Sequence, residues 1–217
     1  MCFSAPASFA ASAGLGALGI GTMLKNKRQE DLPFAAIPLL LGIQQGVEGV
    51  VWLSFGAPAI NSLATYLYTI FSHLLWPIFV PIAVMYAEPD PMQKKRLRLF
   101  VYLGTFVSLY LLYFLSAEPL SCSVVGQSIR YQLAYVAFPE PMLLLYLVAI
   151  CGSCFMSSHQ TIKLLGLVLF AGFLISFWFY YATFFSVWCF FAAILSAIIF
   201  FHVIRSKDSA SSVLQAS

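Results

Sequence analysis

A few polar and ionisable side chains lie inside long apolar stretches of the sequence, and these groups could do chemistry. Glu48 is the only acid well inside such a stretch, and His73 is the only histidine at comparable depth. Gln45 precedes Glu48 by about one helical turn. Ionisable groups within a bilayer are unfavourable unless they are paired, so they are functional candidates by default. A carboxylate and an imidazole together could bind a divalent metal ion or hold a polar ligand.

Two interpretations of Glu48 stay open at this point. In the first, Glu48 is protonated or paired with His73 or Arg130 and only holds helices together. In the second, Glu48 and His73 are the charge or metal partners of a ligand, and Arg130 holds an anionic group. Tyr131 and Trp188 are expected to line the same site, together with Gln45.

The cysteines add a third candidate ligand. If Met1 is removed, Cys2 would offer an amine and a thiol together, which is a chelating pair. The metal set expected under that interpretation is Cys2, Glu48 and His73. A Cys2–Cys122 disulfide is a further option, because both residues map to the same side of the membrane. Cys151 and Cys154 are read as small packing residues of an apolar helix.

The composition determines which elements must position these groups. The chain has 217 residues, of which 61% are hydrophobic and 9% are charged, and its mean hydropathy is +0.91. Soluble domains carry about 25% charged residues. A water-soluble globule, intrinsic disorder and nucleic-acid binding as the main function are therefore excluded, and an α-helical multi-pass membrane protein remains.

The apolar runs predict one domain, residues 1–204, that is a bundle of about seven transmembrane helices, followed by a disordered cytoplasmic tail at 205–217. Each run is long enough for the roughly 20 residues that a spanning helix needs. Pro77 and Pro81 predict a kink in the third span, where neighbouring groups must satisfy the freed carbonyls. The predicted spans are 5–24, 33–54, 63–87, 97–117, 139–157, 161–181 and 183–204.

The basic residues predict the orientation. Of the eleven Lys and Arg residues, all except Arg130 follow the first, third, fifth or seventh span. Because cytoplasmic loops are enriched in Lys and Arg, the N-terminus is expected outside and the C-terminus in the cytoplasm. The net charge of +3 then reflects orientation signals and lipid contacts rather than a nucleic-acid partner. No cleavable signal peptide is expected, because the basic residues follow the first span instead of preceding it.

This orientation places the unusual polar groups in the outer half of the membrane. At about 1.5 Å per helical residue, Glu48 lies roughly 9 Å and His73 roughly 15 Å below the outer boundary. The longest outer segment, residues 118–138, contains Arg130 and Tyr131. It is expected to form an interfacial helix, a lid over the outer mouth or a plain connector.

Six short motifs are spread over nearly the whole chain. They are Met-Cys-Phe-Ser-Ala at 1–5, Gly-Ile-Gln-Gln-Gly-Val-Glu-Gly at 42–49 with Trp52, Leu-Trp-Pro at 75–77, Ser-Ile-Arg-Tyr at 128–131, Ser-Ser-His at 157–159 and Ser-Val-Trp-Cys-Phe-Phe-Ala at 186–192. Together they resemble a family of small bacterial integral membrane proteins of unknown function. The resemblance implies a bacterial inner-membrane location and carries no established activity.

The sequence therefore favours a membrane protein with an outward-facing polar pocket that binds a small molecule, a lipid headgroup or a metal ion. Membrane lipids are the expected surroundings. The alternative is a metal-dependent intramembrane lipid hydrolase, in which zinc bound by Glu48, His73 and Cys2 would activate a water molecule. A further alternative is a structural or assembly partner, or a small-solute transporter. Metal analysis of the wild type beside Glu48→Gln and His73→Ala would separate these interpretations.

Overall fold

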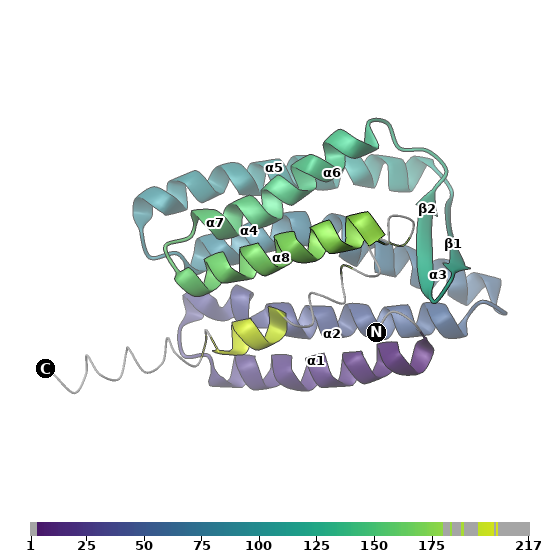
Figure 1. The fold of residues 1–217 in the computed structure, drawn as a ribbon, viewed down its shortest axis with the longest axis horizontal. Helices are drawn as coiled ribbons and strands as arrows, with labels where there is room; N and C mark the ends of the chain where they lie inside the picture. Colours follow the sequence, from purple (N-terminus) through teal and green to yellow (C-terminus); the bar gives the residue numbers. More distant parts are fainter. Residues whose placement is uncertain (1–3, 180–182, 184–187, 189–194, 202, 204–217) are drawn as a thin grey trace, which may run out of the picture.

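The computed structural model describes residues 4–179, 183, 188, 195–201 and 203. Within these residues, six helical segments are long and apolar enough to cross a membrane, at 5–25, 29–53, 58–87, 91–117, 139–156 and 160–179. They run roughly along one axis (Figure 1). The first six predicted spans are confirmed to within a few residues. The predicted seventh, 183–204, lies largely outside the described residues.

The elements follow one another along the chain without a repeat of larger units. Three of the long segments consist of two or three consecutive helical elements. In two of these three segments, one element is π-helical. The elements are α1 (Ala5–Lys25), the 3₁₀ segment η1 (Gln29–Asp31), α2 (Leu32–Leu53), α3 (Pro58–Thr69), the π segment η2 (Ile70–Leu75), α4 (Trp76–Ala87), α5 (Pro91–Ala117), β1 (Leu120–Val125), β2 (Ser128–Leu133), α6 (Pro139–Leu147), the π segment η3 (Val148–Gly152), α7 (Ser153–Met156) and α8 (Gln160–Phe179).

Proline and small polar residues set where helices begin. α1, α2, α3, α5 and α6 each have proline in the first two positions, where its missing N–H is not needed and its fixed φ suits the helix. The Ser4 hydroxyl accepts a hydrogen bond from the backbone N–H of Ala7, and the Asp90 carboxylate accepts one from that of Met92. These caps satisfy amide groups that a helix start leaves without partners.

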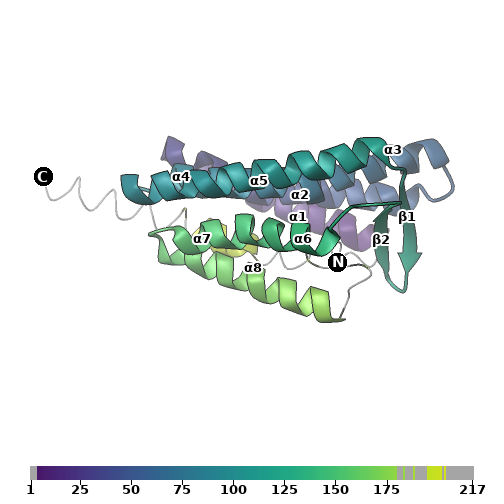
Figure 2. The same cartoon turned by 90° about the horizontal axis from the view of Figure 1, so that it is seen from above.

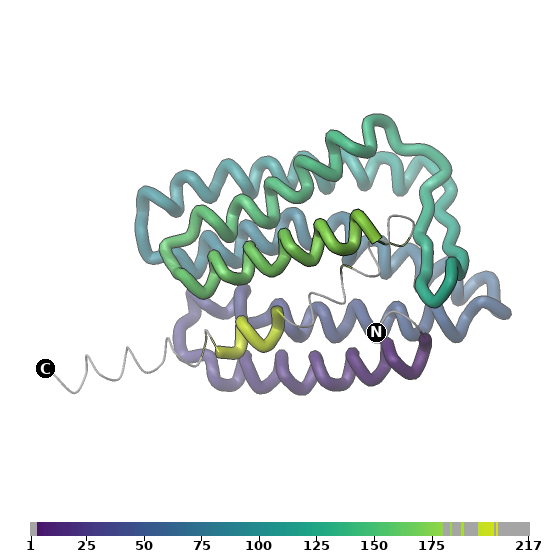
Figure 3. Tube along the Cα trace, viewed as in Figure 1, coloured from purple at the N-terminus to yellow at the C-terminus, as the bar shows by residue number. Residues whose placement is uncertain are grey.

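The described loops divide between two ends of the bundle. The chain trace shows the turns after α1, α4 and α7 at one end, and the turn after α2 and the β-hairpin at the other (Figure 3). The first end, which we call the basic end, carries eight of the eleven Lys and Arg residues. The hairpin end carries Arg130. The basic-end residues are Lys25, Lys27, Arg28, Lys94, Lys95, Arg96, Arg98 and Lys163.

The prolines of the third span coincide with irregular helix, as the sequence predicts. The π segment η2 directly precedes the turn that holds Pro77. Tyr146 Oη donates to the Ser72 carbonyl at 2.6 Å, and Ser108 Oγ donates to the Leu74 carbonyl at 2.7 Å. Side chains of α6 and α5 thus supply hydrogen bonds to carbonyls at the irregular turn, which is how membrane helices tolerate proline.

Residues 118–138 do not form the interfacial helix that we considered from the sequence. They form an antiparallel hairpin in which Leu120 pairs with Leu133 and Val125 with Ser128. The connecting loop is two residues long, and Gly126 there has a φ of 63°, which glycine adopts without strain. Seen from above, the hairpin stands across the end of the bundle beside α3 (Figure 2).

The core lies between two helical layers. One layer contains α1, α2, α4 and α5, and the other contains α6, α7 and α8 (Figure 2). α1 and α2 approach closely, because a Cβ added to Gly19 would lie 2.4 Å from the backbone nitrogen of Leu39. Leu195, Ile199 and Val203, four residues apart near the end of the chain, are buried.

Candidate functional site

A group of buried polar side chains lies in the half of the bundle nearest the hairpin. Such groups are unfavourable in an apolar interior unless hydrogen bonds satisfy them, so this group is a candidate site. We call this set the polar cluster. Its members are Ser8 on α1, Gln44, Gln45 and Glu48 on α2, Thr65, Tyr68 and Thr69 on α3, and Ser72 on η2.

Glu48 and Gln45 form the centre of the polar cluster. Glu48 is fully buried, and Gln45 is 2% exposed. Gln45 Nε2 donates to Glu48 Oε2 at 3.3 Å. Within the described part of the chain, the buried Gln45 Oε1 has no hydrogen-bond donor. An acceptor without a donor is therefore held beside a carboxyl group in a water-poor interior.

Two contacts between α2 and the segment from α3 to α4, one on each side of Glu48 along α2, indicate which residues lie beside Glu48. One turn below it, Gln44 Oε1 accepts a hydrogen bond from Trp76 Nε1 at 2.7 Å. One turn above it, Val51 packs with Ala64. Since α2 and the α3–α4 segment are antiparallel, interpolation places Glu48 level with Tyr68 and Thr69.

The hairpin closes the polar cluster from above. Ile129 is fully buried against Val51 and Ala64, and the Tyr131 ring stacks on the Tyr68 ring with centroids 4.2 Å apart. Tyr131, Gln45 and Glu48, which the sequence selected, therefore belong to the same end of the bundle. Tyr68 was not selected, because a tyrosine in an apolar run gives no signal of which way it faces.

Arg130 lies on the opposite face of the hairpin from Tyr131. Successive side chains of a strand point to opposite sides, and Ile129 and Tyr131 point toward α2 and α3. Among the described residues, ion pairs join Arg28 to Glu30 and to Asp31 at the basic end. No described carboxylate lies within salt-bridge distance of Arg130. The alternative in which Arg130 pairs with Glu48 is therefore not supported.

His73 lies in the π segment η2, half-buried, directly after Ser72. Its Nδ1 is 2.7 Å from Ser72 Oγ. His73 thus belongs to the edge of the polar cluster. Its joint action with Glu48 on one ligand stays a prediction.

The metal interpretation depends on Cys2, which lies outside the described residues. Among the residues that are described, no group of three or more His, Cys, Asp or Glu side chains has an arrangement suited to a metal ion. The predicted set of Cys2, Glu48 and His73 therefore stays a prediction. The Cys2–Cys122 disulfide is not formed in this structure, because Cys122 is a free thiol.

The remaining described cysteines have clear packing roles. Cys122 Sγ accepts a hydrogen bond from Thr65 Oγ1 and donates one to Asn61 Oδ1, both at 3.2 Å, and so ties β1 to α3. Cys151 and Cys154 are free and buried in η3 and α7, as expected of packing residues.

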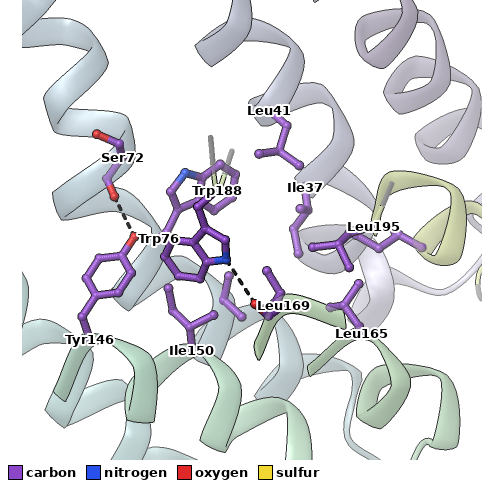
Figure 4. A pocket seen from close by; sticks show the side chains of 12 residues that line it. Ile37, Leu41, Ser72, Trp76, Tyr146, Ile150, Leu165, Leu169, Trp188 and Leu195 are labelled. Atoms are coloured by element: carbon purple, nitrogen blue, oxygen red, sulfur yellow. Dashed lines mark hydrogen bonds between the residues drawn. The ribbon is translucent and has the colours of Figure 1, made fainter. Parts of the chain in front are cut away.

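Trp188 belongs to a different place, a small apolar cavity below the polar cluster. The cavity has a volume of about 60 Å³. Trp188 Nε1 donates to the Leu169 carbonyl at 3.1 Å, and its ring lies near that of Tyr146 (Figure 4). The sequence grouped Trp188 with Glu48 by depth alone. The cavity is lined by Ile37, Leu41, Ser72, Trp76, Val80, Tyr146, Ile150, Leu165, Leu169, Trp188, Leu195 and Ile199.

Comparison with known proteins identifies the family. A family model described as "Family of unknown function (DUF6629)" matches residues 1–214, so the chain belongs to that family. No curated protein and no solved structure matches the chain.

Proposed function

We propose that this chain, as a member of the DUF6629 family, is a membrane protein that binds a polar ligand group in the polar cluster beneath the hairpin. The observation that carries the proposal is the buried Gln45 Oε1, which has no donor within the described residues, beside the buried carboxyl of Glu48. Leaving such an acceptor unsatisfied is unfavourable by about 1–3 kcal/mol, so a ligand that satisfies it would be stabilised.

The chemistry of these two groups selects the ligand. Gln45 Oε1 is an acceptor, and a carboxylate accepts through both oxygens. The matching ligand group is a cationic hydrogen-bond donor, a primary ammonium, because a carboxylate attracts its charge and both acceptors can receive its N–H groups. A small molecule or a lipid headgroup could carry it. A quaternary ammonium, which has no N–H, would not fit.

Ethanolamine and choline make a direct test, because they differ in N–H donors at the nitrogen. We expect ethanolamine to raise the melting temperature of the purified full chain in phosphatidylcholine nanodiscs, and choline to leave it unchanged. Gln45→Leu and Glu48→Gln should weaken the ethanolamine effect about 10- to 100-fold in concentration, because a charge-assisted hydrogen bond contributes about 1.5–3 kcal/mol.

Gln132→Leu is the matched control, since it makes the same change at an exposed position of the hairpin. Equal responses to ethanolamine and choline would contradict the proposal. Stoichiometric metal in the purified wild type that is absent from Glu48→Gln and His73→Ala would replace it by the metal site with Cys2, and would reopen the lipid-hydrolase alternative.

We further propose that the hairpin end faces outward across a bacterial inner membrane. The support is the separation of charge, with eight Lys and Arg residues at the basic end and Arg130 at the hairpin end. Basic residues in short loops are retained on the cytoplasmic side. The ligand would then reach the polar cluster from outside the cell.

Cysteine labelling in intact cells tests this orientation. Ser123→Cys on the hairpin should react with a membrane-impermeant maleimide, and Lys27→Cys should react only after permeabilisation, because both positions are exposed but lie at opposite ends. The wild type, labelled in parallel, gives the background from native cysteines. The reverse pattern would mean that the polar cluster opens toward the cytoplasm.

A further inference from the structure

The described side chains that line the apolar cavity use their N–H and O–H donors within the protein. Trp76 Nε1 is bonded to Gln44, Tyr146 Oη to the Ser72 carbonyl and Trp188 Nε1 to the Leu169 carbonyl. Figure 4 shows the last two of these bonds, which end on the carbonyls of Ser72 and Leu169. The remaining lining residues other than Ser72 are aliphatic. Cavities of this kind stay dry and take apolar guests.

The cavity directly adjoins the polar cluster. Ser72 belongs to both, and Trp76 on the cavity wall is hydrogen-bonded to Gln44 of the cluster. Gln44 precedes Glu48 by one helical turn, which is about 6 Å along the axis. An elongated molecule could therefore place one end at Glu48 and the other among the aromatic rings.

Both π-helical segments of the described chain border this cavity. η2 contributes Ser72 and η3 contributes Ile150. π-helical turns inside α-helices are rare and occur frequently at functional sites. The bond from Tyr146 Oη, on α6 two residues before η3, to the Ser72 carbonyl of η2 joins the helices that carry the two irregular turns, and both turns contribute to the lining of one cavity.

We infer that the ligand is an amphiphile whose hydrocarbon chain enters this cavity while its donor-bearing head group binds at Gln45 and Glu48. This inference rests on the proposed function and adds the class of ligand to it. The volume of about 60 Å³ is less than half of the roughly 150 Å³ that holds a benzene ring. It suits a narrow chain segment rather than a ring.

The two cavity tryptophans make the inference testable. Trp76 and Trp188 are 7% and 6% exposed, whereas Trp178 on α8 is 83% exposed. In a Trp52→Phe/Trp178→Phe background, the probe is octylamine with bromine at the chain end, because bromine quenches tryptophan fluorescence on contact. We expect saturable quenching in phosphatidylcholine nanodiscs, and at least tenfold weaker quenching by the trimethylammonium analogue.

Cavity filling supplies the matched variants. Leu165→Phe enlarges a buried wall residue of α8 and should weaken quenching about tenfold or more, whereas Leu167→Phe, at a 55% exposed position of the same helix, should not. If Leu165→Phe does not fold, Leu41→Phe on the opposite wall replaces it. Melting curves of each variant without probe show whether it is folded.

The outcomes separate the two proposals. Quenching that is equally strong with the amine and the trimethylammonium probe, but is lost in Leu165→Phe, would support a hydrocarbon-chain site in the cavity. It would contradict binding of the polar head group at Gln45 and Glu48. Head-group selectivity in melting temperature without saturable quenching, or with equal quenching of the Leu165→Phe and Leu167→Phe variants, would overturn the inference and leave the proposed function standing. Non-saturable quenching alone would mean bulk partitioning and would also overturn it.

Discussion

Replacing Gly104 with alanine is expected to destabilise the protein by about 3 kcal/mol, at the upper end of overpacking effects, and replacing it with valine should prevent stable folding. A Cβ at this position of α5 would lie 1.7 Å from the Pro77 carbonyl oxygen and 2.6 Å from the Pro77 carbonyl carbon. Both are backbone atoms of α4, so no side chain can move aside and the two helices would have to separate.

The proline pattern explains why α5 comes so close. In a regular helix the Pro77 carbonyl would accept from residue 81, and Pro81 has no N–H. The absence of a side chain on Gly104 lets α5 lie directly against this carbonyl, in the manner of the small residues that bring membrane helices together. Gly104 therefore determines the distance between α4 and α5, which are neighbours in the layer that also contains α1 and α2.

Thermal unfolding in nanodiscs measures the effect. A loss of about 3 kcal/mol corresponds to a fall of roughly 10 °C in melting temperature for a chain of this size. Gly14→Ala on α1 is the control, because a Cβ there meets nothing within 4 Å, and it should stabilise slightly or have no effect. Equal melting temperatures for Gly104→Ala and Gly14→Ala would contradict the close α4–α5 contact.

The spans were predictable because they depend only on apolar length. A bilayer requires about 20 apolar residues per helix, so the six described spans follow from hydropathy alone. The prolines likewise predicted irregular helix near Pro77. The particular donors, Tyr146 and Ser108, could not be predicted, because they come from other helices whose rotation hydropathy does not encode.

The hairpin was missed although its sequence carries a signal. Gly126-Gln127 separates two runs that are rich in β-branched and aromatic residues, which is typical of a two-residue hairpin loop. Residues 118–138 were interpreted only as a connection between two spans, for which an interfacial helix, a lid or a plain connector was predicted. A hairpin is tolerated here because it lies beyond the helix ends, where water or headgroups can satisfy its free edges.

The candidate site was predicted in part. Glu48 and Gln45 were predicted because polar residues are rare in membrane-spanning helices. Their burial in a bilayer is unfavourable, so their presence indicates a structural or functional role. Depth placed Arg130 and Trp188 at the same site, but direction separates them: the strand turns Arg130 away from the polar cluster, and Trp188 faces the cavity. The cavity itself has no sequence signal, because its aliphatic walls resemble any lipid-facing helix.

Replacing Glu88 with glutamine is expected to destabilise the protein by about 2 kcal/mol near neutral pH, because a hydrogen bond to a charged group contributes about 1.5–3 kcal/mol. Glu88 follows α4 at the basic end. Glu88 Oε2 accepts from Ser157 Oγ at 3.0 Å and from the Ser158 backbone N–H at 2.7 Å, and Oε1 accepts from the Asp90 backbone N–H at 3.2 Å. The carboxylate thus joins the α4–α5 turn to the α7–α8 turn.

The pH dependence distinguishes the charged form of Glu88 from simple packing. Burial alone would raise the pKa of Glu88, but the hydrogen bonds from Ser158, Asp90 and Ser157 lower it below its ordinary value of 4.5. A carboxyl whose pKa is lower in the folded state stabilises that state above the unfolded pKa and loses this contribution as the pH falls through the folded one. The difference in stability between wild type and Glu88→Gln should therefore be full at neutral pH and shrink below about pH 4.5.

Melting curves of both proteins in nanodiscs between pH 7 and pH 3 measure this difference. Ser157→Ala should show a smaller loss with the same direction, because it removes one donor and leaves the backbone donors in place. Glu140→Gln, an exposed acid in the first turn of α6, is the charge-matched control and should change stability by less than about 1 kcal/mol. A Glu88→Gln effect that persists undiminished at pH 3 would show that the ionised carboxylate is not what joins the two turns.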